Sequence, residues 1–211
     1  ANRTKKMDIE KGEFTHYLPY PDDTVAHMRN FVISMLEDKS HNFWLATVND
    51  GGVHILDRKT GKFTHYLQRH SVTDLFEDSD GKIWAGAEDG LYSFNKAVDS
   101  FTLTTDPSTN SGFSTFGIQE DKDKNLWISS GAGLYRIGKD RTVLSKFGKS
   151  LGLNISTVTG VGIYKAGDGQ QFLGAEGAFY SFYPDKITSN PNPPEIVITD
   201  FRIGDHPVID R

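Results

Sequence analysis

Seven polar or charged residues in the segments between hydrophobic stretches could bind or transform a ligand. They are Asn49, Asp50, Arg69, His70, Glu88, Asp89 and Glu176. Carboxylates, an amide and a guanidinium together can hydrogen-bond to a hydroxyl-rich ligand, and an imidazole beside a carboxylate can transfer a proton. The histidines are dispersed along the chain and no nucleophile stands with a base, so no catalytic residue is predicted. The sequence therefore favours a binding site over a catalytic one.

A calcium loop is the metal site that the sequence suggests, at residues 78–81. Alternating carboxylates followed by glycine can wrap a hard cation, but the distal bidentate glutamate of such loops is absent. The other repeats described below do not keep the carboxylate pair followed by glycine. We therefore interpret Asp80-Gly81 as a hairpin turn, and we predict neither a metal nor a cofactor.

Three tryptophans reveal the repeat that must position these side chains. Trp44, Trp84 and Trp127 are each preceded, seven residues earlier, by a Glu-Asp pair. A fourth copy has Phe172 in place of tryptophan and lacks the acidic pair. Because one position recurs in unit after unit, Trp44, Trp84, Trp127 and Phe172 are predicted to fill the core between units rather than to stack on sugars.

Each unit contains short alternating stretches that are typical of strands and are joined by turn sequences. In the second unit the first strand is expected around Thr73 and Leu75, and the others at residues 83–87, 90–94 and 101–103. The centre of the first strand is a small or short residue, such as Ser34, Asp74 or Gly117, as expected near a shared axis. Residues 7–18 match only the second half of a unit.

The units cannot bury both of their faces alone, so they must stack around an axis. The predicted fold class is all-β, with four-stranded antiparallel β-propeller blades. Half a blade and four repeats do not make a neat closed ring, so an incomplete propeller is expected.

The repeat resembles that of the two-component regulator propeller family. The resemblance is carried by residues 33–57, 72–94 and 116–137 and extends over residues 7–187. After prolines 191, 193 and 194, residues 195–208 resemble the opening of a Y_Y_Y domain. The expected domains are therefore a propeller region at residues 1–189, followed at residues 190–211 by a linker and the first strand of a Y_Y_Y-type β-sandwich.

The family resemblance implies the periplasmic sensor region of a membrane-spanning, often hybrid, histidine kinase that commonly responds to oligosaccharides. The leading hypothesis is a non-enzymatic fragment that binds an oligosaccharide or another polar small molecule, with a homodimer as one arrangement of the parent. One alternative is a propeller lyase or glycosidase that uses His70 or Glu88. Another is a protein-interaction scaffold.

Bulk composition excludes other functions. A formal charge of -5 and a pI near 5.8 argue against nucleic acid, which would require a basic stripe. The sequence has no apolar run long enough for a bilayer, so membrane contact is expected only through the rest of the parent chain. With no cysteine, the chain has neither disulfides nor thiolate ligands.

Overall fold

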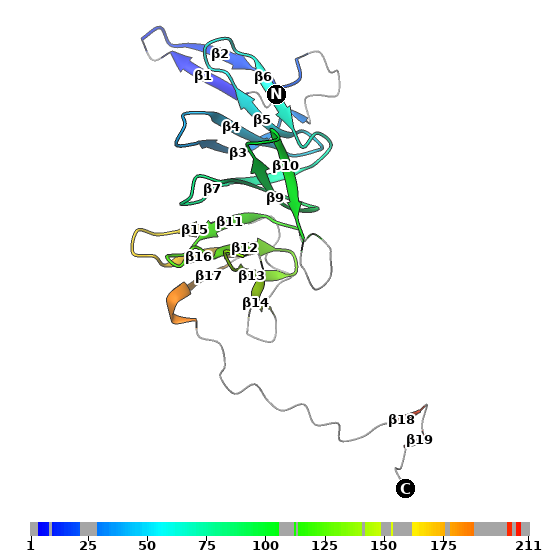
Figure 1. The fold of residues 1–211 in the computed structure, drawn as a ribbon. Coiled ribbons are helices and arrows are strands. Elements are labelled where there is room, and N and C mark those ends of the chain that lie inside the picture. Colours follow the sequence, from blue (N-terminus) through cyan, green and yellow to red (C-terminus); the bar gives the residue numbers. More distant parts are fainter. Residues whose placement is uncertain are drawn as a thin grey trace.

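The structure is an array of antiparallel sheets. A computed structural model describes residues 4–8, 10–21, 29–105, 112, 114–140, 142–148, 153, 162–175, 178–187, 202–203 and 206–207 (Figure 1). These residues form strands and a short 3₁₀ helix, η3 (Pro184–Lys186). The predicted all-β class is therefore confirmed.

The strands follow the predicted repeat. The N-terminal hairpin consists of β1 (Thr4–Asp8) and β2 (Glu13–Tyr17). Blade one consists of β3 (Val32–Glu37), β4 (Phe43–Thr47), β5 (Gly52–Leu56) and β6 (Phe63–Tyr66). Blade two consists of β7 (Val72–Glu77), β8 (Ile83–Ala87), β9 (Gly90–Asn95) and β10 (Ser100–Thr104). Blade three consists of β11 (Gly117–Glu120), β12 (Leu126–Ser130), β13 (Gly133–Ile137) and β14 (Val143–Phe147). Blade four contains β15 (Ile163–Lys165), β16 (Gln171–Ala175) and β17 (Ala178–Phe182).

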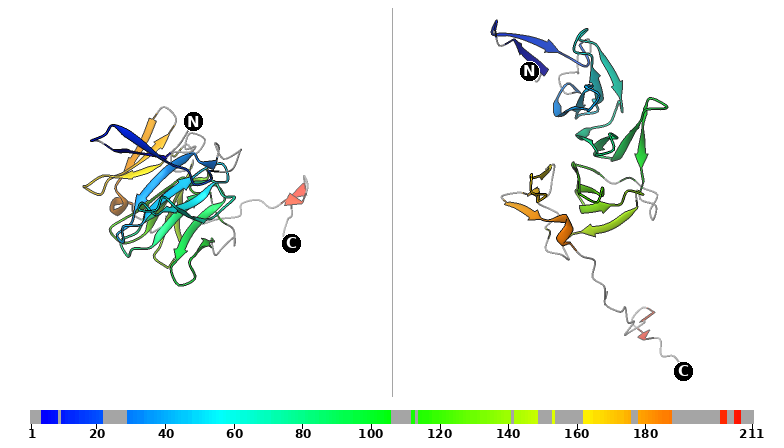
Figure 2. Two further views of the ribbon diagram at one scale, coloured as in Figure 1. Left: turned by 90° about the horizontal axis from the view of Figure 1, so that it is seen from above. Right: turned by 60° about the vertical axis from the view of Figure 1, so that its left-hand side comes forward.

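The blades are arranged around an arc, which the right-hand view of Figure 2 shows most clearly. In each blade the strands pair in sequence order, and all pairs are antiparallel. The first strands β3, β7, β11 and β15 contact one another in succession and line the inner side of the arc. This is the packing of a β-propeller, in which each sheet covers the face of its neighbour.

Each tryptophan is buried between its own blade and the next one. Trp84 is fully buried against Ile118, Ile128 and Tyr135 of blade three. Trp44 packs in the same way against blade two, and Trp127 packs against blade four. The prediction that the tryptophans form the core between units is confirmed.

The aspartate of the acidic pair closes the turn between the first two strands. The carboxylate of Asp78 accepts hydrogen bonds from the backbone N–H groups of Asp80 (3.0 Å) and Lys82 (2.9 Å), and from Trp84 Nε1 (2.8 Å). Blades one and three repeat this arrangement. Because the Asp78 oxygens bind these donors, the segment at residues 78–81 is the expected hairpin turn rather than a calcium loop.

The glutamate of the acidic pair joins one blade to the preceding blade. Glu77 Oε2 accepts a hydrogen bond from the backbone N–H of Lys39 (3.0 Å), and Glu120 Oε2 accepts one from Ser79 (2.9 Å). Each donor is the residue that follows the aspartate in the preceding blade. In the Glu-Asp-Trp pattern, the aspartate therefore accepts hydrogen bonds within its own blade, including one from the tryptophan, and the glutamate accepts one from the preceding blade.

Blade four departs from this pattern and contains a polar residue where the other blades have apolar ones. Gln171 is fully buried, and neither side-chain amide atom has a hydrogen-bond partner. The equivalent residues are Phe43, Ile83 and Leu126. Phe172 is half-buried rather than buried, with its ring near Tyr164 and Phe179.

Replacing Gln171 with leucine is expected to raise the free energy of unfolding by about 1–2 kcal/mol, because an unsatisfied buried amide is removed. Urea titration followed by circular dichroism measures the change. Gln119→Leu is the matched control, since Gln119 Nε2 donates to the carbonyl of Ile163 (3.3 Å) and its loss should destabilise. Equal effects of the two substitutions would contradict this account.

The C-terminal segment remains largely a prediction. Only β18 (Arg202–Ile203) and β19 (His206–Pro207) are described there, as a short antiparallel pair. The expected domain boundary at residues 189 and 190, and the rest of the segment at residues 195–208, lie outside the described residues. No helix in the described part of the chain is long and apolar enough to cross a bilayer.

Candidate ligand-binding face

Two loops of blade one form the centre of the candidate site. The loop between β4 and β5 is two residues longer than its counterpart between β8 and β9, and it holds Asn49 (φ 55°) and Asp50 (φ 63°) in the left-handed region. Asn and Asp adopt this conformation more readily than most residues do. Glycine is required at Gly51, because a side chain there would clash with Thr47 Oγ1 and the carbonyl of Arg29.

The loop between β6 and β7 is fastened to this longer loop. The backbone N–H of Arg69 donates to the carbonyl of Asp50 (3.1 Å), and that of Gly52 donates to the carbonyl of His70 (3.0 Å). Asp50 N–H also donates to Ser71 Oγ (3.3 Å). Arg69 itself has φ 70°, a conformation that arginine adopts only when its surroundings hold it there. The two loops therefore form one fixed frame.

The same frame extends to blade two through His70. His70 Nδ1 lies 2.9 Å from Asp89 Oδ2, and Tyr92 Oη donates to the same oxygen (2.8 Å). The backbone N–H of Glu88 donates to the carbonyl of Ser71 (3.1 Å). Burial and the bond to Asp89 raise the pKa of Tyr92, so Tyr92 stays a donor. Because Asp89 binds Nδ1–H, His70 presents Nε2 as its other ring nitrogen.

The buried His54 and the half-buried His65 support the longer loop. His54 Nε2 lies 2.9 Å from Thr47 Oγ1, which donates to the carbonyl of Gly52 (3.1 Å). Since Thr47 has only one hydroxyl proton, His54 Nε2 must donate, and its Nδ1 accepts from His65 Nδ1 at 2.9 Å. Tyr20 stacks on His65 and donates to the carbonyl of Gly51 (2.8 Å).

A cavity of about 450 Å³ lies beside this frame, on the inner side of the arc. It is lined by the first strands of all four blades, by Val48 from the loop between β4 and β5, and by Glu88 from the loop between β8 and β9. In its wall, Asp74 accepts hydrogen bonds from Ser34 Oγ (3.2 Å) and from the backbone N–H of Ile118 (2.9 Å), and so joins three blades. Burial raises the pKa of Asp74 to about 6. The volume is in the range of small-molecule sites.

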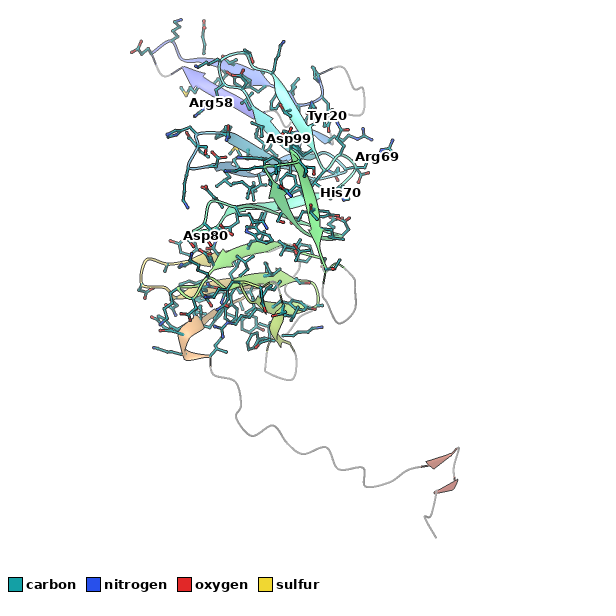
Figure 3. All side chains as sticks on the ribbon, in the orientation of Figure 1. Tyr20, Arg58, Arg69, His70, Asp80 and Asp99 are labelled. Carbon is teal, nitrogen blue, oxygen red and sulfur yellow. The ribbon has the colours of Figure 1, made fainter. Side chains whose placement is uncertain are left out.

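The structure brings six of the seven predicted site residues together at one end of the blades. They are Asn49, Asp50, Arg69, His70, Glu88 and Asp89. Glu176 lies outside the described residues. Figure 3 shows Arg69 and His70 at the end of the blades opposite to Asp80 and Arg58.

Sequence reasoning missed three contributors to this face. Tyr92 and His54 occupy one repeated position, which by itself indicates core filling, and His54 replaces tyrosine in the one blade with the longer loop. Asp74 was expected only to be short. Its charge among the small residues Ser34 and Gly117 was the signal that could have identified it.

Comparison with known proteins shows similarity to two-component regulator propellers. Residues 66–89 match the family described as "Two component regulator propeller". The matched stretch runs from the end of β6 through β8 to the loop that follows it. A stretch of 95 residues is 28% identical to Histidine kinase P4 of Formosa agariphila. The aligned stretch covers 45% of this chain and 7% of that protein.

Solved structures agree on the fold. The extracellular domain of the putative one component system BT4673 from B. thetaiotaomicron superposes with a TM-score of 0.64 at 18% identity, over 85% of this chain and 24% of that one. That of the putative hybrid two component system BT3049, from the same organism, gives 0.61 at 19% identity, over 91% and 30%. Virginiamycin B lyase from Staphylococcus aureus gives 0.59 at 16% identity, over 89% and 64%. The chain thus spans less than a third of these two extracellular domains, and the propeller neighbours also include a lyase.

Proposed function

We propose that this chain is part of the extracellular sensor region of a two-component regulator, and that its loop face binds an oligosaccharide without transforming it. The observation that supports this proposal is the fixed frame of loops that presents Asp50, Arg69, His70 and Asp89 beside a cavity of about 450 Å³. Carboxylates, a guanidinium and an imidazole are suitable partners for sugar hydroxyls.

Glycan microarrays followed by calorimetry on the 211-residue chain test the proposal. Binding with no product detected by mass spectrometry is expected. An absence of binding across neutral, acidic and amino-sugar oligosaccharides would count against it.

His70→Gln is expected to weaken glycan binding by about tenfold, because one hydrogen-bonding group of the site is altered. His41→Gln is the matched control, since His41 is an exposed histidine with positive φ on the turn between β3 and β4, at the other end of blade one. Calorimetry measures both affinities. Equal glycan affinities of the two variants would show that His70 does not contact the glycan.

The second candidate function is a lyase. It is favoured by the His70–Asp89 pair, which holds an imidazole with one nitrogen fixed, as a general base requires. This candidate predicts that a bound oligosaccharide is converted to an unsaturated product, and that Asp89→Asn abolishes the conversion. A stable complex with intact ligand would exclude it.

We further infer that the full protein presents this region in the periplasm as the sensor of an inner-membrane histidine kinase, and that it acts as a homodimer. Residues 190–211 would then begin the Y_Y_Y domain that passes the signal toward the membrane. Protease accessibility of the tagged full protein in spheroplasts tests the location. Protection from external protease would contradict it.

A further inference from the structure

The interface between blades three and four differs in its chemistry from the two interfaces before it. In the described part of the chain, the buried side-chain nitrogen and oxygen atoms without a hydrogen-bond partner are Arg136 Nε and both amide atoms of Gln171. Gln171 stands at the position where Ile83 and Leu126 pack with the tryptophan of the preceding blade. Its buried amide therefore faces blade three.

Both of these polar groups lie around Trp127. The ring of Phe182, the register partner of Gln171, is centred 4.9 Å from the ring of Trp127. The guanidinium of Arg136 lies over the same tryptophan, 5.6 Å from its ring centre, and Nη2 is 3.5 Å from Asp121 Oδ2. Closing this interface leaves buried polar atoms unpaired, which costs free energy that the other two interfaces do not lose.

The carboxylates that join the other blades have no equivalent at this interface. Asp74 accepts a hydrogen bond from the backbone N–H of Ile118 (2.9 Å) and so joins blade two to blade three. The equivalent residue of blade three is Gly117, which has no side chain to do the same for blade four. Lys165 stands at the position of the bridging glutamates, and its exposed Nζ donates to the carbonyl of Glu120 (2.8 Å).

The other polar contacts between blades three and four also come from long side chains. Gln119 Nε2 donates to the carbonyl of Ile163 at 3.3 Å. Lys122 Nζ lies 3.2 Å from Asp185 Oδ2, and both of these side chains are exposed. Exposed ion pairs contribute little to stability. The interface is therefore held mainly by the apolar contacts around Trp127.

The same interface forms part of the wall of the cavity of about 450 Å³. Ile118 and Gln119 line the cavity from blade three, and Gly162 and Ile163 line it from blade four. The strands that carry them, β11 and β15, lie side by side (Figure 1). Separation of blades three and four therefore opens the cavity along this wall.

We propose that blade four is a movable wall of the cavity, which separates from blade three and returns to it while blades one to three stay packed. Separation lets water reach Arg136 Nε and the amide of Gln171, which offsets part of the cost of exposing apolar surface. Native proteins open locally in this way at their least stable units. A molecule that contacts both sides of the wall favours the closed form, a consequence that rests on the proposed function, whereas the movement itself does not.

Single cysteine substitutions test the proposal, because the chain has no cysteine of its own. Leu173→Cys, Ile128→Cys and Ala85→Cys each place a thiol at one repeated, fully buried position, in the three–four, two–three and one–two interfaces respectively. Labelling with iodoacetamide in native buffer, followed by mass spectrometry, is expected to be about tenfold or more faster for Leu173→Cys than for the other two. Urea titration of each variant gives the labelling that global unfolding contributes, and this contribution is subtracted.

Adding Gln171→Leu to Leu173→Cys is expected to slow the labelling by about fivefold or more, because the closed interface then contains no unpaired amide. The same addition to Ile128→Cys should leave its labelling by local opening unchanged. Equal labelling of the three single variants, or no slowing on adding Gln171→Leu, would overturn the proposal. Since the experiment uses no glycan, a chain that shows the expected rates but binds no oligosaccharide would contradict the proposed function alone.

Discussion

Trp84→Ala is expected to lower the free energy of unfolding by about 3–5 kcal/mol, the usual cost of truncating a large buried aromatic side chain. Trp84 is fully buried between blades two and three, and the substitution leaves a cavity against Ile118 and Ile128. It also removes the donor that Asp78 Oδ2 accepts at 2.8 Å. Urea titration followed by circular dichroism measures the loss. A loss below 1 kcal/mol would show that the tryptophan is not the core of this interface.

Trp84→Phe and Asp78→Ala separate packing from hydrogen bonding. Phe keeps most of the buried ring, whereas Asp78→Ala leaves Nε1 of Trp84 buried without its acceptor. The double variant is expected to lose less than the sum of the two single variants, because the donor and its acceptor disappear together. Blade four already has this combination, with Ala166 and Phe172 at these positions. Strict additivity would show that the Asp–Trp bond contributes nothing.

The fold was predictable because its main signals are local and repeated. A buried tryptophan at one strand position and an aspartate that caps the preceding turn recur three times, so spacing alone identified the strands around Trp84 and Trp127. The exposure of Met35 was not predictable from the same pattern. Its sequence position is that of a core residue, and only the arrangement of blades shows that no described strand covers it.

The location of the candidate site was predictable from the sequence, but the contacts between its side chains were not. Loop position and charge were sufficient to select His70 and Asp89, because loops at one end of a propeller converge. The bond between them joins two blades, and no sequence spacing encodes such a contact. Likewise, His54 and His65 are aligned with residues of other blades, but their contact and its tautomers follow only from strand register, in which the two residues face each other.

Two buried groups are expected to change stability with pH in opposite directions. Burial, and to a smaller extent the charge on His65, lower the pKa of His54 from 6.5 to about 3. The stability that His54 contributes is therefore present above about pH 6.5 and is lost as the pH falls toward 3. Burial raises the pKa of Asp74 from 3.8 to about 6, although bonds from Ile118 and Leu75 oppose it. The contribution of Asp74 is thus present at low pH and is lost as the pH rises through 6.

Removing either group should therefore expose the effect of the other between pH 7 and pH 5. In Asp74→Asn, acidification over this range lowers the free energy of unfolding by about 2 kcal/mol, because only the histidine effect remains. In His54→Leu, acidification raises it by about 1 kcal/mol, because only the aspartate effect remains. The pH dependence of the unmodified chain lies between those of the two variants, since the two effects largely offset each other.

Urea titrations of the three proteins at both pH values measure these differences. Equal pH dependence in the two variants would show that neither group is buried as described. The sign of the change, rather than absolute stability, decides the test, because each substitution also alters local packing.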